Sequence, residues 1–190
     1  MLTLATVVEA LTGQSFAFLD QVVTDGAIDS RLAIPGALFV ALPGERADGH
    51  DYLTQAFERG AVAALIERDV TGPWTVLDLR APLTEEQARA CRAPVCLRVP
   101  ASLPALQAVA AAWRARLTGL RVIGITGSVG KSSTKELAGE VLEGRFRTLR
   151  NPGNLNNEIG LPLTLLSLTE AHERVVLEMG FYVIGEINLL

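Results

Sequence analysis

Hydrophobic residues in the first hundred positions change their spacing after Gly13. Before it, Leu4, Val7, Val8 and Leu11 follow the i, i+3, i+4, i+7 pattern of an amphipathic helix, which the glycine ends. Beyond it, apolar residues occur in short runs bounded by glycine, proline or charge, and such runs predict buried strands. These runs cover residues 37–42, 61–66, 75–79 and 95–99.

Segments with helical spacing separate and follow these runs. One helical pattern lies within 48–60 and is closed by Gly60, and another covers 103–117. The polar, proline-flanked segment 80–94 is expected to lie at the surface with at most one helical piece. The first half of the chain therefore combines strands and helices.

The second half continues the alternation with a different kind of connection. A strand is expected at 121–125, followed by a glycine-rich turn at 126–130 and a helix at 131–143. A second strand is expected at 146–149, an asparagine-rich loop at 151–157, a second helix at 159–168 and a third strand at 174–179. Alternation of this kind predicts parallel sheets with right-handed crossovers. We expect an α/β fold with two domains, 1–100 and 101–190.

Composition argues against nucleic-acid-binding, membrane-spanning and secreted proteins. A net charge of -4 over 190 residues argues against a nucleic-acid partner, because phosphate backbones are neutralised by basic surfaces. No apolar run approaches the roughly 18 residues that cross a membrane, and the first residues lack the features of a signal peptide. We expect a cytoplasmic protein in which Cys91 and Cys96 are reduced thiols.

The glycine-rich turn predicts a phosphate-binding loop. A turn between a strand and a helix, with glycines at 127 and 130, lets backbone amides and the helix N-terminus approach an anion. Lys131 is expected to pair with the β and γ phosphates of a nucleotide, and the Ser132 hydroxyl to bind Mg²⁺. The expected nucleotide-binding residues are Thr126, Gly127, Ser128, Val129, Gly130, Lys131 and Ser132.

This motif is incomplete. The full pattern GxxxxGK[ST] requires a first glycine where Ile125 stands, and Gly124 lies one residue too early. The alternative is a tight strand-to-helix turn with an exposed lysine.

Two further features lie near the same sheet edge. Glu178, at the carboxyl end of an apolar strand, is the expected second ligand of Mg²⁺, and the alternative is a strand residue that faces solvent. Asn154, Asn156 and Asn157 cluster in a loop before a helix. Helix capping explains one or two of them, so the cluster favours a ligand-facing loop.

Three blocks resemble the ATP-dependent Mur ligases of peptidoglycan synthesis. They are 29–68, 122–142, and 151–168 with the short stretches 175–180 and 185–187. The resemblance implies a UDP-substrate domain followed by the first part of a P-loop domain, with ATP and Mg²⁺ as cofactors and a monomeric protein. It also implies that Ser30 and Arg31 contact UDP, with Arg46 and His50 as weaker candidates. As alternatives, Arg46 is a solvated charge and His50 a helix cap.

Within the family, the asparagine-rich block is similar to members that join UDP-MurNAc-tripeptide to D-alanyl-D-alanine. A sister enzyme is expected to have Thr-Thr-Pro there. The resemblance implies that ATP phosphorylates the terminal carboxylate of the tripeptide and that the amine of D-alanyl-D-alanine attacks the acyl phosphate. Lys131 and Glu178 then supply the charge neutralisation that phosphoryl transfer needs.

Two departures from the family pattern follow. Val183 stands near the place of a polar residue that helps a second metal, which puts a second Mg²⁺ site in doubt. The sequence ends at Leu190 inside the P-loop domain, so we expect no ligation and an unpaired apolar edge after strand 174–179.

Two other function classes remain open. One is a UDP-sugar-binding module with a vestigial phosphate loop. The other is a P-loop small-molecule kinase, against which the residues after the loop offer no candidate catalytic base or lid of arginines.

Overall fold

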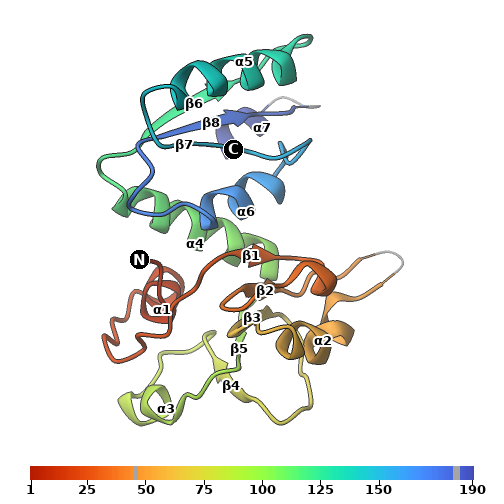
Figure 1. The fold of residues 1–190 in the computed structure, drawn as a ribbon. Helices are drawn as coiled ribbons and strands as arrows, with labels where there is room; N and C mark the ends of the chain where they lie inside the picture. The colour runs from red at the N-terminus through yellow and green to blue at the C-terminus, as the bar shows by residue number, and fades with distance from the viewer. Residues whose placement is uncertain (45–46, 182–184) are drawn as a thin grey trace. The chain divides into compact units, whose positions relative to one another are not determined.

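The computed structural model describes residues 1–190 except 45–46 and 182–184 (Figure 1). The chain divides into two units, Met1–Ala112 and Trp113–Leu190. The division lies inside helix α4, Ser102–Arg116, whereas the limits expected from the sequence lie just before it. Arg46 and Val183, both singled out in the sequence, lie outside the described residues.

The N-terminal unit is built on one sheet. Its strands are β1 (Gly26–Ala27), β2 (Leu38–Val40), β3 (Ala63–Ile66), β4 (Thr75–Asp78) and β5 (Val95–Arg98). Its helices are α1 (Leu4–Thr12), η1 (Ser30–Leu32), η2 (Gly49–Tyr52), α2 (Leu53–Glu58), α3 (Glu85–Ala90) and most of α4. All strand pairs are parallel, in the order β1-β2-β3-β5-β4. The α/β class predicted from the alternation is confirmed.

Local signals explain several element ends. Gly13 ends α1 with φ 71°, a left-handed conformation that glycine adopts without steric cost. Segment 80–94 contains one short helix, α3, which begins with a capping box between Thr84 and Gln87. Cys91 and Cys96 are buried free thiols, as expected, and burial raises the pKa of Cys96 to about 12.

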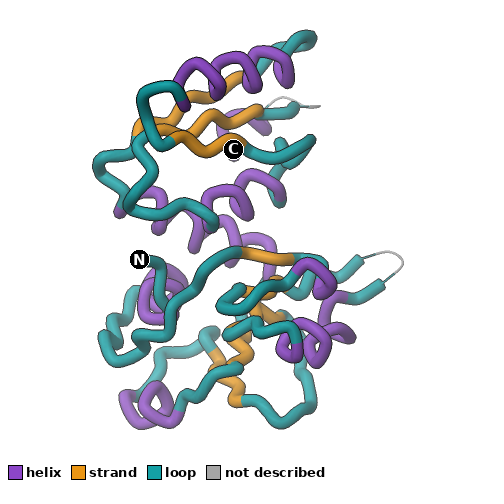
Figure 2. The backbone as a smooth tube through the Cα atoms, viewed as in Figure 1, coloured by secondary structure: helices purple, strands orange, loops and turns teal. Residues whose placement is uncertain are grey.

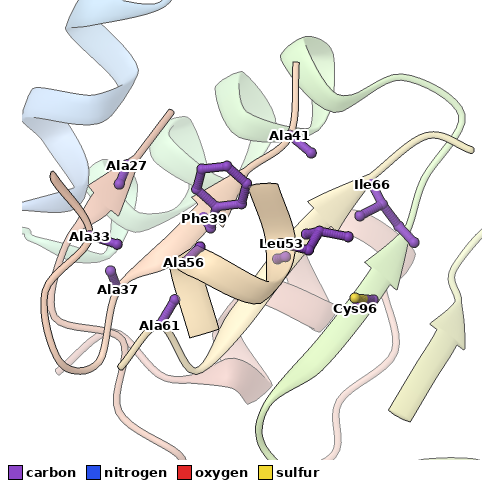
Figure 3. Packing of buried hydrophobic residues seen from close by; sticks show 11 residues of the cluster. Ala27, Ala33, Ala37, Phe39, Ala41, Leu53, Ala56, Ala61, Ile66 and Cys96 are labelled. Carbon is purple, nitrogen blue, oxygen red and sulfur yellow. The ribbon is translucent and has the colours of Figure 1, made fainter. Parts of the chain in front are cut away.

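The core of this unit lies where α2 packs on the central strands. Every residue of β2 and β3 is buried, which explains why their sequences are continuously apolar instead of alternating. Phe39 from β2 and Leu53 and Ala56 from α2 belong to one buried cluster (Figure 3). Small residues around them allow the helix to approach the sheet closely.

Truncation of Leu53 tests this packing. Leu53→Ala is expected to lower the free energy of unfolding by about 2–5 kcal/mol, because the buried side chain leaves a cavity. Urea unfolding followed by circular dichroism measures the effect. Leu32→Ala, at an exposed position of the same unit, is the matched control and should change stability by about 0.5 kcal/mol or less. Equal effects of the two variants would contradict the described core.

The C-terminal unit has a second parallel sheet. Its elements are β6 (Arg121–Ile125), α5 (Lys131–Glu143), β7 (Thr148–Arg150), α6 (Gly160–Leu166), β8 (Arg174–Glu178) and α7 (Glu186–Leu189). The strand order is β6-β8-β7, and α5 and α6 lie on opposite sides of the strands (Figure 2).

The expectation of an unpaired edge at strand 174–179 is wrong. β8 lies between β6 and β7 and pairs with both, so the edges of this sheet are β6 and β7. Val175, Val176 and Leu177 are accordingly buried, whereas the residues of β6 are partly or fully exposed. Among the described residues, no helix is long and apolar enough to cross a membrane.

Candidate nucleotide-binding site

The glycine-rich turn joins the end of β6 directly to the start of α5. Gly127 has φ 140° and Gly130 has φ 80°, backbone conformations that residues with a Cβ rarely adopt. A Cβ built at either glycine would have no neighbouring atom within 4 Å. These glycines are therefore needed for the path of the backbone, and the space beside them is open.

The start of α5 has the properties of an anion-binding helix end. Gly130 precedes the helix, and no side chain caps it. The first amides of a helix have no partner inside the helix and carry the positive end of its dipole. Val129 is almost fully exposed, so its side chain does not fill the space beside the turn. The turn and helix can together bind a phosphate group.

Lys131 and Thr126 fix the turn from its two ends. The Lys131 ammonium donates a hydrogen bond to the carbonyl of Gly127, 2.7 Å away, so this side chain folds back across the turn. The Thr126 hydroxyl donates to the carbonyl of Met179 at 3.1 Å and links the turn to the end of β8. A positive charge thus lies over the amides that would bind phosphate.

Glu178 lies beside this turn. It is the last residue of β8 and stands in register with Ile125, the last residue of β6. Its side chain is buried, with a residue exposure of 3%. Oε1 accepts a hydrogen bond from the Asn156 amide at 2.8 Å, whereas Oε2 is buried and accepts none of good geometry from the described residues. Glu178 does not face open solvent.

The surroundings of Glu178 keep it ionised. Burial acts to raise the pKa of Glu178, but interactions with the Asn156 amide and the Ser132 hydroxyl lower it. The ammonium groups of Lys135 and Lys131 act in the same direction, and the net pKa lies below the ordinary value. The carboxylate is therefore charged and close to the Ser132 hydroxyl.

A divalent cation fits this arrangement. The free Oε2 of Glu178 and the Ser132 hydroxyl are oxygen ligands of the kind that Mg²⁺ prefers. No group of three or more histidine, cysteine, aspartate or glutamate residues that could hold a metal occurs in the described part of the chain. Mg²⁺ commonly binds through one or two protein ligands with water and phosphate oxygens, so the small ligand set suits it.

The asparagine-rich loop makes most of its hydrogen bonds to other groups of the protein. Asn156 binds the carboxylate of Glu178, and its carbonyl accepts the backbone N–H of Gly180 at 2.8 Å. Asn157 accepts the backbone N–H groups of Ile159 and Gly160 at 3.3 and 2.8 Å and caps the start of α6. Asn154 is exposed. Of the three predicted residues, one contacts the candidate metal ligand and one is a helix cap.

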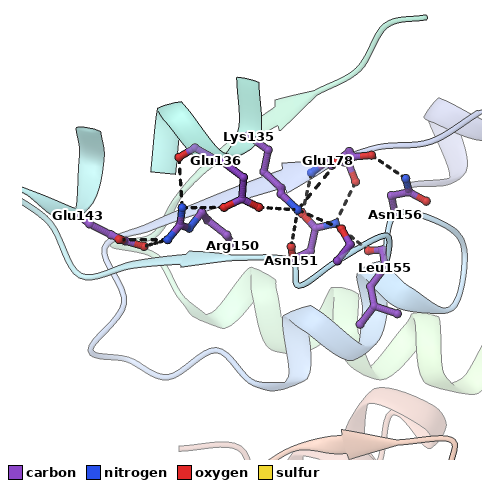
Figure 4. A network of polar contacts seen from close by, with 9 residues as sticks. Lys135, Glu136, Glu143, Arg150, Asn151, Leu155, Asn156 and Glu178 are labelled. Carbon is purple, nitrogen blue, oxygen red and sulfur yellow. Dashed lines mark hydrogen bonds and ion pairs between the residues drawn. The ribbon is translucent and has the colours of Figure 1, made fainter. Parts of the chain in front are cut away.

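The sequence analysis missed Asn151 and Lys135. Asn151 is buried and makes two hydrogen bonds to the backbone of Glu178, accepting from N at 2.8 Å and donating to O at 3.4 Å (Figure 4). Lys135 is also buried and donates to the carbonyls of Asn151 and Gly153 (Figure 4). These side chains join α5, the asparagine-rich loop and the end of β8.

The buried face of α5 explains why Lys135 was missed. The buried residues of this helix are Lys135 and Gly139, whereas Leu137 and Val141 are 64% and 78% exposed. Hydrophobic spacing therefore points to the wrong face. A Cβ at Gly139 would lie 2.1 Å from Cδ of Arg150, so glycine at this position lets the Arg150 side chain pass between helix and strand.

The N-terminal unit contains a separate pocket of about 480 Å³. Its lining includes Ser30, Arg31, Tyr52 and Gln55. The Ser30 hydroxyl is 2.5 Å from Oε1 of Gln55, and Arg31 forms a two-point hydrogen bond with Asp29 at 2.9 and 2.6 Å. The two residues predicted as the main UDP contacts thus lie in one pocket.

His50 has partners on both ring nitrogens. Its Nε2 accepts the backbone N–H of Glu67 at 3.0 Å, so the proton is on Nδ1, which donates to Asp48 at 2.5 Å. The side chain is buried and connects the segment after β2 to the end of β3. Both ring nitrogens are therefore engaged inside the protein.

Asp48 makes the stability of this region depend on pH. Burial raises the pKa of Asp48, but hydrogen bonds from His50 and Arg68 outweigh it and lower the pKa to about 2. The unfolded carboxyl has a pKa of about 3.9. The stabilisation is therefore complete above the unfolded pKa and is lost as pH falls towards 2.

Asp48→Asn is expected to flatten the dependence of unfolding free energy on pH between about pH 5 and pH 2, since this carboxylate no longer releases its proton on folding. Urea unfolding at a series of pH values measures this. Asp20→Asn, which changes an exposed carboxylate of the same unit, is the control. An identical pH dependence of Asp48→Asn and the unmodified chain would contradict the assignment.

Comparison with known proteins covers both units. The model for the Mur ligase family catalytic domain matches residues 26–114, and that for the Mur ligase middle domain matches 125–190. The UDP-N-acetylmuramoyl-tripeptide–D-alanyl-D-alanine ligase of Bacillus subtilis is 42% identical over 172 residues, which cover 90% of this chain and 34% of that protein. The chain thus spans about a third of the curated relatives it matches.

Solved structures agree with the sequence matches. MurF from Acinetobacter baumannii is similar with a TM-score of 0.73 and 32% identity, covering 97% of this chain and 37% of that one. MurF ligase from Thermotoga maritima, in complex with ADP, has a TM-score of 0.64 and 29% identity, covering 95% and 35%. With both of its units matched by models of one family and its fold shared with members of that family, the chain belongs to the Mur ligase family.

Proposed function

We propose that this chain carries the UDP-substrate pocket and the phosphate-binding loop of a ligase that joins D-alanyl-D-alanine to UDP-MurNAc-tripeptide. The relatives at about 40% identity carry this activity in their names. One observation supports the ATP-dependent part most directly: a buried, ionised Glu178 with a free oxygen lies beside the Ser132 hydroxyl at an uncapped helix start.

Each residue of the loop has a proposed role. Backbone amides from Thr126 to Ser132 bind the terminal phosphates of ATP, as the geometry at Gly127 and Gly130 allows. Lys131 moves from the Gly127 carbonyl to the β and γ phosphates. Ser132 and Glu178 hold Mg²⁺, which neutralises charge on the phosphates when bound.

The reaction needs alignment more than a protein nucleophile. The carboxylate of the tripeptide attacks the γ phosphate, ADP leaves, and the amine of D-alanyl-D-alanine displaces phosphate from the acyl phosphate to form an amide. Two anions must meet in the first step, so positive charge from Lys131 is the main contribution of the described residues. No protein atom is covalently modified in this scheme.

The substrate nucleotide is proposed to bind in the N-terminal pocket. Ser30 and Arg31 offer a hydroxyl and a guanidinium, and Tyr52 offers an aromatic ring, beside a volume of about 480 Å³. A uracil ring can stack on an aromatic side chain, and a guanidinium pairs well with a diphosphate. His50 is proposed to support this pocket through Asp48 and not to contact UDP.

Separate titrations test the proposal. Isothermal titration of the chain with UDP-MurNAc-tripeptide and with Mg²⁺·ATP should show binding of both. Ser30→Ala should weaken only the first ligand and Lys131→Met only the second, because the two residues lie in different units. Binding of UDP-MurNAc-tripeptide without any binding of ATP would instead support a UDP-sugar-binding module with a vestigial phosphate loop.

A further inference from the structure

The buried ammonium of Lys135 has a complete set of hydrogen-bond partners. Its side chain is 1% exposed, and Nζ lies 2.9 Å from the carbonyl of Asn151, 3.1 Å from that of Gly153 and 3.1 Å from Oε1 of Glu136. A lysine ammonium has three N–H donors. All three are therefore used by acceptors on α5 and the asparagine-rich loop.

This arrangement leaves one oxygen of Glu178 charged but without a hydrogen bond. Nζ of Lys135 is 3.9 Å from Oε2 of Glu178, which is beyond hydrogen-bond distance. A positive charge at this range still favours the ionised carboxylate. Because the donors of Lys135 point elsewhere, the lone pairs of Oε2 stay available to a cation.

Lysine is rare among the basic residues of this chain, and one of its two lysines is the buried Lys135. Of the 17 lysines and arginines, only Lys131 and Lys135 are lysines, and both lie in the first turns of α5. Arginine presents a planar fork, whereas lysine is a compact charge with three donors. Convergent carbonyls around a buried position suit the lysine ammonium.

We propose that Lys135 is a positioning residue for the cation ligand Glu178, an inference that rests on the proposed ATP and Mg²⁺ site. By bonding to Asn151 and Gly153 it holds the loop whose Asn151 side chain binds the backbone of Glu178. It also places positive charge beside Oε2 without occupying it.

A purely structural role for Lys135 predicts a different result from the proposed positioning role. If the ammonium only stabilised the unit, its loss would weaken ATP binding equally with and without a divalent cation. If it holds Glu178 in place for the cation, its loss should weaken mainly the binding that needs the cation, because Lys135 bonds the loop whose Asn151 side chain holds the backbone of Glu178. The gain in ATP affinity on adding the cation therefore separates the two roles.

Binding of ATP with and without Mn²⁺, measured by isothermal titration and by electron paramagnetic resonance of the Mn²⁺, tests the proposal. Lys135→Met is expected to weaken binding of Mn²⁺·ATP by about 10- to 100-fold, as for other groups that orient metal ligands, and to leave the binding of ATP alone unchanged. Lys135→Arg keeps the positive charge and should recover part of the loss. Glu140→Gln, exposed on the same helix, is the control and should behave like the unmodified chain.

A second measurement does not depend on the folding of Lys135→Met. With selective ¹⁵N labelling of lysine, the chain gives two side-chain ammonium signals, which Lys131→Arg assigns. The Lys135 signal should exchange slowly with water and shift in Glu178→Gln. An unmoved signal, or an unchanged gain in ATP affinity from Mn²⁺ in Lys135→Met, would overturn the inference alone. Failure of the unmodified chain to bind Mn²⁺·ATP would overturn the proposed function and this inference with it.

Discussion

Lys131→Met should weaken binding of Mg²⁺·ATP to this chain by about 10- to 100-fold, the loss expected when one hydrogen bond to a charged group is removed. Methionine keeps an unbranched apolar stem, and the Thr126 hydroxyl still links the turn to the end of β8, so the turn should stay folded. Isothermal titration or fluorescence of a labelled nucleotide measures the affinity. No other described side chain in the turn carries a charge to replace the ammonium.

Arg121→Met is the matched control for this variant. It removes the same charge at the opposite end of β6, where the strand begins, and should leave the ATP affinity unchanged. Equal loss in the two variants would indicate a general effect of net charge. Unchanged affinity in Lys131→Met would mean that the nucleotide does not lie over the turn.

Asn151→Leu is expected to destabilise the C-terminal unit by about 3 kcal/mol or more, because each buried polar group that loses its partner costs about 1–3 kcal/mol. Asn151 donates to the carbonyl of Leu155 at 2.8 Å and binds both backbone groups of Glu178. Leucine has the same branching and the same number of side-chain heavy atoms but can satisfy none of these hydrogen bonds. The free energy of unfolding by urea measures the loss.

The control for Asn151→Leu lies in the same loop. Asn154→Leu changes an exposed asparagine and should alter the stability by about 0.5 kcal/mol or less. If the two variants were equally stable, the buried hydrogen bonds of Asn151 would not hold the loop against β8.

Elements with strong local signals were predicted well from the sequence. The helix expected over 131–143 has these bounds in the structure, because Gly130 precedes it in a left-handed conformation and a glycine follows its last residue. The strand of β6 also matches residue by residue. Both depend on nearby residues, so the sequence pattern was sufficient.

Two features that depend on distant residues were not predicted. Placing β8 at the centre of its sheet requires knowledge of which strands pair across a long connection, and parallel pairing leaves no local trace. Lys135 was missed for a related reason. A lysine is normally exposed, and the carbonyls of Asn151 and Gly153, which lie 16 and 18 residues further along the sequence, help to make its burial favourable.

In the asparagine-rich loop, the residue type alone does not determine the role of each asparagine. The same side chain can cap a helix, bind a carboxylate or face a ligand. The structure gives Asn157 the first role and Asn156 the second, and it leaves Asn154 exposed. A ligand contact by Asn154 stays a prediction.

Isothermal titration of ATP with and without Mg²⁺, into the unmodified chain and Glu178→Gln, tests most directly whether this turn and this carboxylate form a nucleotide site. We predict that Mg²⁺ strengthens ATP binding to the unmodified chain and that Glu178→Gln loses this gain while it keeps the weaker binding that Lys131 supports. An equal gain from Mg²⁺ in both proteins, or no ATP binding by the unmodified chain, would contradict the account.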